Sequence, residues 1–233
     1  MILDGFPRVL WINLQRSKDR YQIMSDLCKS YNLQNHRIEA VDGLGAWAHL
    51  ERYVVPNPTL TKKETACSIS HLSAIMYFLH KMTDPYVVIF EDDVSFEFLQ
   101  YIPYNWSTFM NSLPNDWQVV QLSVSELEPI SDINLIRTQE GDGRYCSAAY
   151  LINREGAKNI LDQYFSPRVN KYVLYGKYHP TSDQIICHTV PTYSIPIFTY
   201  HNNSSTIHPE HLVYHIASKD HQQKVWEGSV GSQ

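Results

Sequence analysis

The sequence has none of the closely spaced cysteine pairs that form zinc knuckles or redox-active motifs. Its four cysteines are spread over 233 residues, which also disfavours a small scaffold held together by disulfides. No apolar run approaches the roughly 20 residues that a membrane-spanning helix requires. The N-terminus carries Asp4 and runs straight into a strand-like segment, unlike a signal peptide. We therefore expect a cytoplasmic or otherwise soluble protein without a transmembrane segment.

An excess of positive charge is also lacking. There are 19 Lys and Arg against 24 Asp and Glu, so the net charge is −5 and the pI is about 6.1. With this net charge the protein as a whole does not attract nucleic acid. An anionic ligand would have to be held by nearby basic residues or by a metal. Glycine is scarce at 9 residues, and 43% of the chain is hydrophobic, which excludes a disordered or collagen-like chain.

Short apolar runs alternate with longer amphipathic segments. Strands are expected at residues 9–13, 36–40, 86–90, 117–122 and 146–152, and helices at 18–31, 62–82, 155–164 and 182–188. Thr61 and Glu64 form a capping-box pattern at the start of the second helix. The alternation predicts an α/β fold with a Rossmann-like, mainly parallel central sheet flanked by helices. We expect one domain over residues 1–233, wrapped by loops from about residue 189 onward.

The strongest functional signal is the acidic triplet that follows the strand predicted at 86–90. In open α/β sheets, ligands bind beyond the carboxyl ends of the strands. Adjacent carboxylates repel one another, and Mg²⁺ or Mn²⁺ is a natural counter-charge that is commonly shared with phosphate. Side chains two residues apart in an extended segment point the same way, so Glu91 and Asp93 are expected to face one ion. The alternative is a solvated acidic loop, which the preceding buried strand disfavours.

A second cluster lies where the first predicted strand meets its helix. Arg16 and Arg20 beside a helix N-terminus form an anion site. Asp19 either orients an arginine or accepts from a base or ribose. Asp42, in the turn after the second strand, is a ribose acceptor or merely a turn former. The alternative for the whole cluster is a capped helix with surface ion pairs.

Five motifs occur in the order seen in glycosyltransferase family 25: LWINLQRSKDR, RIEAVDG, LTKKETACSISH, VVIFEDDV and CSAAYLINREGAKNIL. The chain resembles this family from about Val9 to Asp183. The family includes lipopolysaccharide glycosyltransferases and procollagen galactosyltransferases. The resemblance implies a GT-A-type fold, a UDP-sugar donor, Mn²⁺ (or Mg²⁺) and inversion at the anomeric carbon. We expect a galactose or glucose transferase that acts on a hydroxyl of a glycan, lipopolysaccharide or protein.

The resemblance also implies roles for individual residues. The Glu-Asp-Asp triplet resembles the DxD-type motif of the family, which places Glu91 and Asp93 on the metal and diphosphate. The implied donor-nucleotide residues are Asn13, Arg16, Asp19, Arg20, Asp42 and Asp92. The sequence departs from the family pattern at Lys63, where glycine is more frequent.

Asp183 is the expected catalytic base. An inverting transferase needs a base to take the proton from the acceptor hydroxyl, and the family has an acidic residue followed by an apolar helix in this region. The alternative is a carboxylate that favours the helix N-terminus electrostatically. His201, or else His208, is a candidate for completing the metal site, with a surface role as the alternative.

Cys67 and His71 lie four residues apart on the helix predicted at 62–82 and therefore share a face. That spacing can bind zinc, but no second ligand pair is visible in the sequence. We favour a helix that supports the nucleotide site, in which His71 has a structural role and donates a hydrogen bond.

Three other functions are alternatives to the glycosyltransferase hypothesis. A non-catalytic carbohydrate-binding or scaffold domain would keep the fold without the reaction, but an intact acidic triplet counts against it. A glycoside hydrolase needs two carboxyl groups that flank the scissile bond, roughly 5–9.5 Å apart, and Asp92 and Asp93 are adjacent. A metal-dependent phosphohydrolase would need further His and Asp ligands in compact motifs.

Overall fold

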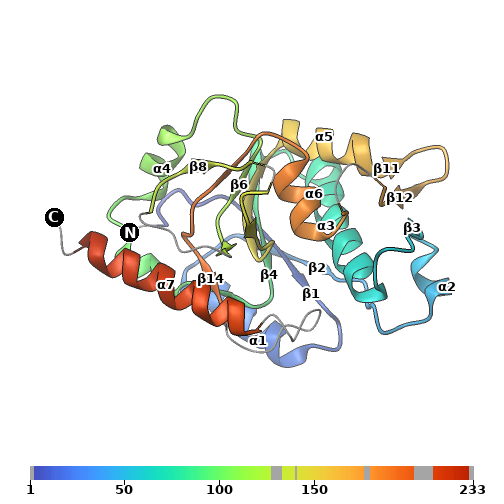
Figure 1. Cartoon of the computed structure of the whole chain (residues 1–233), viewed down its shortest axis with the longest axis horizontal. Helices are drawn as coiled ribbons and strands as arrows, with labels where there is room; N and C mark the ends of the chain where they lie inside the picture. The colour runs from blue at the N-terminus through green and yellow to red at the C-terminus, as the bar shows by residue number, and fades with distance from the viewer. Residues whose placement is uncertain (1–2, 127–132, 140, 176–178, 202–211, 231–233) are drawn as a thin grey trace.

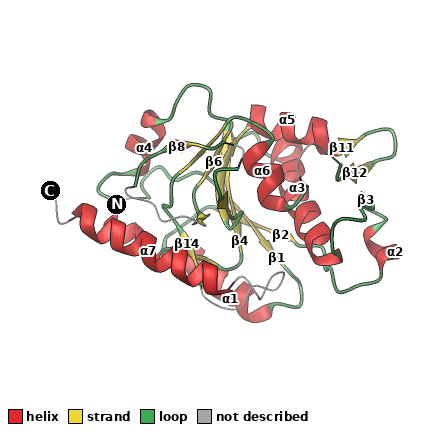
Figure 2. Ribbon diagram, viewed as in Figure 1, coloured by secondary structure: helices red, strands yellow, loops and turns green. Residues whose placement is uncertain are grey.

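A seven-stranded sheet forms the centre of the molecule, and helices cover both of its faces (Figure 1 and Figure 2). This computed structural model describes residues 3–126, 133–139, 141–175, 179–201 and 212–230. The strands of the sheet are β1 (Val9–Asn13), β2 (Asn35–Glu39), β4 (Tyr86–Glu91), β6 (Val119–Gln121), β8 (Ile136–Arg137), β10 (Ala149–Asn153) and β13 (Thr192–Ser194). The helices are α1 (Lys18–Ser30), α2 (Trp47–Leu50), α3 (Lys62–Lys81), α4 (Trp106–Ser112), α5 (Arg154–Tyr164), α6 (Ser182–His188) and α7 (Leu212–Val230), with a 3₁₀ helix η1 (Glu97–Tyr101).

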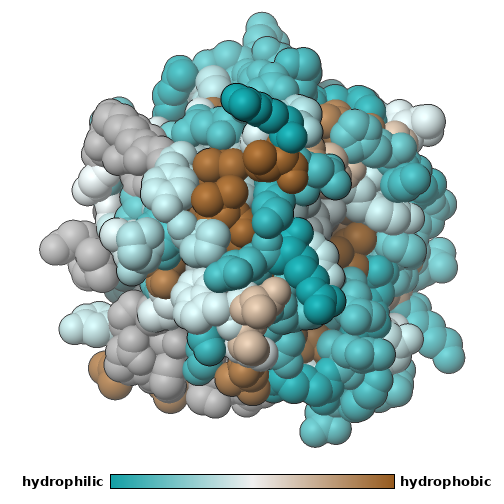
Figure 3. Space-filling view, turned by 90° about the vertical axis from the view of Figure 1, so that its right-hand side faces the viewer, coloured by the Kyte–Doolittle hydropathy of each residue, from teal (hydrophilic) through white to brown (hydrophobic). Residues whose placement is uncertain are grey.

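Three smaller sheets lie around the central one. One joins β3 (Val54–Val55), β11 (Phe165–Ser166) and β12 (Lys171–Val173). The other two pair β5 (Val94–Ser95) with β14 (Thr199–Tyr200) and β7 (Ser125–Glu126) with β9 (Arg144–Tyr145). Figure 3 shows the face that carries α2 and β3, which is largely hydrophilic. No helix in the described part of the chain has the length and apolar character needed to cross a membrane.

The strand order of the central sheet is β2-β1-β4-β10-β6-β13-β8. Strands β2, β1 and β4 run parallel to one another, and β6 runs parallel to β13, whereas β10 is antiparallel to both of its neighbours. The predicted α/β class with a mainly parallel sheet and flanking helices is confirmed. Because β1, β2 and β4 are parallel, their carboxyl ends meet at one edge of the sheet.

Strand β4 is apolar on both sides because both faces of the sheet are covered. Val87 and Ile89 lie in the core beneath α3 and α5, whereas Val88 and Phe90 lie in the core beneath α1 and α4. All four side chains are fully buried. A continuous apolar run therefore ends abruptly at Glu91, which brings the acidic triplet to the sheet edge.

Helix α3 begins with the predicted capping box. The Thr61 hydroxyl accepts from the Glu64 backbone N–H at 3.2 Å, and the Glu64 carboxylate accepts from the Thr61 N–H at 2.8 Å. The turn after β2 lies directly on this helix start. A Cβ atom at Gly43 would be 2.8 Å from the Lys63 Cα, so only glycine permits this approach.

The expectation that only loops follow residue 189 is wrong. Residues 192–194 form β13, and residues 212–230 form α7, a helix of 19 residues. Residues 231–233 lie outside the described residues. Helix α7 packs against β7 and η1, so this segment covers the same α/β unit.

Polar side chains on the buried side of α7 explain why its sequence pattern is misleading. Gln222 is 1% exposed and donates to the Val124 carbonyl at 2.9 Å. Lys219, also buried, donates to the Tyr200 carbonyl at 3.3 Å and pairs with Glu97 at 2.6 Å. Residues of these types normally mark the solvent face of a helix. The apolar periodicity that identifies most helices is therefore absent from α7.

Candidate active site

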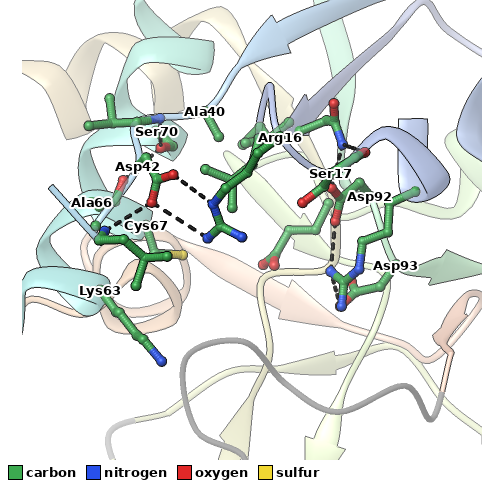
Figure 4. A pocket seen from close by; sticks show the side chains of 18 of the residues that line it. Arg16, Ser17, Ala40, Asp42, Lys63, Ala66, Cys67, Ser70, Asp92 and Asp93 are labelled. Carbon is green, nitrogen blue, oxygen red and sulfur yellow. Dashed lines mark hydrogen bonds and ion pairs between the residues drawn. The ribbon is translucent and has the colours of Figure 1, made fainter.

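A cavity of about 120 Å³ lies at the carboxyl ends of β1, β2 and β4, against the first half of α3 (Figure 4). Seven residues singled out from the sequence line it: Asn13, Arg16, Arg20, Asp42, Glu91, Asp92 and Asp93. The cavity also contains Lys63, Cys67 and His71. The parallel strands thus bring together three segments that lie far apart in the sequence.

Asp92 connects the acidic triplet to the first strand and helix. Its two carboxylate oxygens accept from Asn13 Nδ2 at 2.6 Å and from Arg20 NH1 at 2.8 Å. The same guanidinium nitrogen lies 3.3 Å from the Asp93 carboxylate. Because Asp92 is 8% exposed, these charge-assisted bonds are strong ones. Asp92 therefore holds Arg20 in place at the floor of the cavity.

Arg37 begins the motif RIEAVDG, but the sequence patterns gave it no role. It lies on β2 beside β1, and its Nε donates to Asn13 Oδ1 at 3.0 Å. A second bond joins the Arg37 guanidinium to the Asn13 carbonyl at 3.2 Å. Arg37 thereby fixes the Asn13 amide so that its nitrogen faces Asp92. Arg37 and Asn13 are neighbours only because β1 and β2 pair in parallel. The sequence gives no local pattern for this contact, since the two residues lie far apart along the chain.

Glu91 and Asp93 make different contacts. Glu91 Oε1 accepts from Ser147 Oγ at 2.7 Å and lies 3.3 Å from His71 Nε2, while Asp93 contacts Arg20. Among the described residues, the set of three metal-ligating atoms that lie within 4.8 Å of one another belongs to Cys67, His71 and Glu91. The expected pairing of Glu91 with Asp93 on one ion stays a prediction.

The charges of the triplet are not balanced. Burial, and then the neighbouring Glu91 charge, raise the pKa of Asp93 to about 7, although Arg20 opposes this shift. Burial also acts to raise the pKa of Glu91, but the hydrogen bond and charge of His71, the bond from Ser147 and the charge of Arg20 together outweigh burial and leave that pKa below its usual value. One arginine faces three carboxylates here. This oxygen-rich donor set fits a hard divalent cation, which would supply the missing positive charge.

Arg16 and Asp42 lie at the rim of the cavity and point toward each other (Figure 4). Arg16 Nε donates to Asp42 at 2.7 Å, and the Leu44 N–H also donates to this carboxylate. The bond from Arg16 is the main reason why the pKa of Asp42 is lowered. Both side chains are more than one-third exposed, so the pair contributes little to stability and can open for a ligand at small cost.

Two predicted residues lie away from the cavity lining. Asp19 is exposed on α1 and does not line the cavity, so its predicted nucleotide contact has no support from the geometry. His201 is tied to the triplet through its backbone, because its N–H donates to the Asp93 carbonyl at 2.8 Å. The His201 side chain is not part of the Cys67 group. His208 lies outside the described residues.

Asp183 lies next to the site rather than in its lining. Its Oδ1 accepts from Thr181 Oγ1 at 2.7 Å and from the Gln184 N–H at 3.0 Å. The preceding residue, Ser182, contacts Ser147 at 3.0 Å and Cys67 at 3.4 Å. Helix α6 therefore presents Asp183 beside the hydrogen-bond network that surrounds Glu91. Ser182 is a further site residue that no motif identified, whereas Ser147 lies in the motif CSAAYLINREGAKNIL without a role having been assigned to it.

Comparison with known proteins gives a family for this chain. The model of glycosyltransferase family 25 (LPS biosynthesis protein) matches residues 6–171. Procollagen galactosyltransferase 2 from Mus musculus is 29% identical over 175 residues, and the Homo sapiens protein of the same name is 27% identical. Each match covers 67% of this chain and 28% of the relative. The chain thus spans well under half the length of these relatives.

Solved structures give more distant matches. The structure of A197 from STIV aligns with 83% of this chain and over 83% of its own length, with 12% identity and a TM-score of 0.42. A glycosyltransferase involved in glycosylation of the major capsid of PBCV-1 aligns with 94% of this chain and over 98% of its own length, with 9% identity and a TM-score of 0.41.

The charge imbalance predicts a pH-dependent effect of Asp93→Asn on stability. The pKa of Asp93 is raised from an ordinary value near ~3.9 to about 7, so ionisation of this carboxyl disfavours the folded state. The cost is absent below about pH 4 and complete above about pH 7. In metal-free protein, Asp93→Asn should raise the free energy of unfolding at about pH 8 by on the order of 4 kcal/mol and should have little effect near pH 4.

Urea unfolding with a chelator present measures this difference across the pH range. Asp26→Asn is the matched control, because Asp26 is exposed on α1, and its effect should not vary in this way. An Asp93→Asn effect that stays constant between about pH 4 and pH 8 would contradict the charge imbalance.

Proposed function

The chain belongs to glycosyltransferase family 25, and we propose that it transfers a sugar from a UDP-sugar to a hydroxyl group with inversion at the anomeric carbon. The observation that carries this proposal is the cavity at the ends of β1, β2 and β4, which is lined by the acidic triplet, by Arg20 paired with it and by Arg16 paired with Asp42. The named galactosyltransferase relatives favour galactose as the sugar, with glucose as the alternative. The acceptor is a glycan, a lipopolysaccharide or a protein.

The donor nucleotide occupies the part of the cavity between α1 and the turn after β2. Asp42 accepts from the ribose, and Arg16, released from its exposed pair with Asp42, binds the diphosphate. Arg20 adds a second positive charge near Asp93. A guanidinium suits this task because it offers several N–H donors in a planar arrangement.

A divalent metal, Mn²⁺ or alternatively Mg²⁺, is the cofactor. Asp93 and Glu91 would hold it, with His201 as a further candidate because its backbone is bonded to Asp93. When bound, the ion supplies positive charge to the diphosphate leaving group. The excess negative charge around Asp93 supports this assignment.

Asp183 acts as the base that accepts the proton of the acceptor hydroxyl. This assignment is supported by the position of Asp183 directly after Ser182 on the first turn of α6, since Ser182 contacts Ser147 and Ser147 donates to Glu91. Bonds from Thr181 and Gln184 fix its orientation. The acceptor therefore approaches from the α6 side, opposite the donor nucleotide.

The first test is UDP binding by thermal denaturation. UDP with Mn²⁺ should raise the melting temperature, because a ligand selective for the folded state stabilises it, and a chelator should reduce that shift. Arg16→Ala should weaken UDP binding by about 1.5–3 kcal/mol if Arg16 contacts phosphate. Arg8→Ala is the control, because Arg8 is similarly exposed and paired with an aspartate, Asp84. Equal UDP affinity in the two variants would remove Arg16 from the donor site.

The second test separates donor binding from proton transfer. Asp183→Asn keeps the size and capping ability of the side chain but removes the proton-accepting charge. UDP-sugar binding should survive, while single-turnover transfer should fall by roughly two to four orders of magnitude. Transfer within a few-fold of normal would leave Asp183 as a carboxylate that only stabilises the helix N-terminus, and loss of UDP binding would place it in the donor site instead.

A further inference from the structure

Three residues of different chemistry meet on the wall of the cavity, between α3 and the end of β4. Cys67 and His71 lie one helical turn apart on α3, and Glu91 is the last residue of β4. The Cys67 sulfur, a His71 ring nitrogen and a Glu91 oxygen all lie within 4.8 Å of one another. The cavity wall therefore brings a thiol, an imidazole and a carboxylate together at one point.

The spacing of these atoms suits a tetrahedral ion. Zinc ligands lie roughly 2.0–2.3 Å from the metal, so that neighbouring ligand atoms in a tetrahedron are roughly 3.3–3.6 Å apart. His71 Nε2 and Glu91 Oε1 are 3.3 Å apart. Small side-chain rotations would bring the Cys67 sulfur to the third corner, because it belongs to the same compact group.

Each ligand already has a neighbour that orients it. The second ring nitrogen of His71 lies 3.2 Å from the hydroxyl of the fully buried Tyr150. Ser147 donates to Glu91, and Ser182 contacts the Cys67 sulfur. Metal-binding histidines usually have such a partner on the ring nitrogen that does not bind the ion. The outer contacts thus fix the side chains independently of the ion.

We propose that Cys67, His71 and Glu91 form a binding site for Zn²⁺, which shares Glu91 with the proposed Mn²⁺ position but uses Cys67 and His71 in place of Asp93. A thiolate and an imidazole select zinc over harder cations, whereas Mn²⁺ prefers oxygen ligands. All three residues line the cavity, so the fourth coordination position opens toward the ligand space. Zn²⁺ binding releases the thiol proton of Cys67 to solvent. The imidazole of His71 then carries its proton on Nδ1, where the Tyr150 hydroxyl accepts it, so that Nε2 and the Glu91 oxygen each bond to the ion in place of their hydrogen bond to one another.

Occupancy of this site by Zn²⁺ would affect the sugar transfer proposed above. Glu91 is shared, because it is one of the two carboxylates assigned to Mn²⁺. A Zn²⁺ ion that holds Glu91 toward α3 reduces the charge available beside Asp93. Zinc therefore inhibits the Mn²⁺-dependent reaction, and it does so through Cys67 and His71.

Cobalt provides the direct test, because Co²⁺ occupies zinc sites and gives a thiolate-to-metal charge-transfer absorption band. The metal-free chain of 233 residues is titrated with Co²⁺, and Zn²⁺ is then added to displace it. The wild-type chain should show the band at one equivalent, and Zn²⁺ should abolish it. Cys67→Ser should lose the band, and His71→Gln should weaken Co²⁺ binding by at least about tenfold.

Two control variants make the test specific. Cys146→Ser should keep the band, because Cys146 is also half-buried but lies outside the group. Asp93→Asn should also keep it, which separates this site from the proposed Mn²⁺ position. Far-ultraviolet circular dichroism checks that every variant is folded. Absence of the band in wild type, its persistence in folded Cys67→Ser, or its loss in folded Asp93→Asn would overturn the proposal.

Discussion

The ion-pair network between Arg20 and the carboxylates of Asp92 and Asp93 is the constraint on which the site depends. It joins α1 to the end of β4, at 2.8 Å to Asp92 and 3.3 Å to Asp93. Asn13 completes it from β1 by donating to Asp92. Without this network the carboxylates at the end of a buried strand would repel one another with no cation nearby. The network also places Arg20 where an anionic ligand would reach it.

The network compensates only part of the negative charge, and the proposed function follows from the remainder. Asp93 has a raised pKa because burial and Glu91 outweigh Arg20. A divalent cation would neutralise the remaining negative charge of the triplet, and it would also attract the negatively charged diphosphate of the donor. The exposed Arg16–Asp42 pair at the rim can exchange its partners for the nucleotide. Binding of donor and metal is therefore expected to be mutually favourable at this site.

The sequence predicts well those features that depend on local pattern. The capping box of Thr61 and Glu64, the apolar strand before Glu91 and the family motifs all lie within short segments. Features that depend on contacts between distant segments were not predictable. Arg37 orients Asn13 across two strands, and α7 was missed because its buried face uses polar side chains such as Gln222. Side-chain direction was equally hidden, because Glu91 turns toward His71 rather than toward Arg20.

Anomalous diffraction from crystals grown with UDP and Mn²⁺ tests the central claim, that the cavity at the ends of β1, β2 and β4 binds the donor nucleotide through a metal. The account predicts a manganese peak beside the Asp93 carboxylate. It also predicts uridine diphosphate density between the Asp42 turn and Arg20. A manganese peak away from the acidic triplet, or nucleotide density outside this cavity, would contradict it.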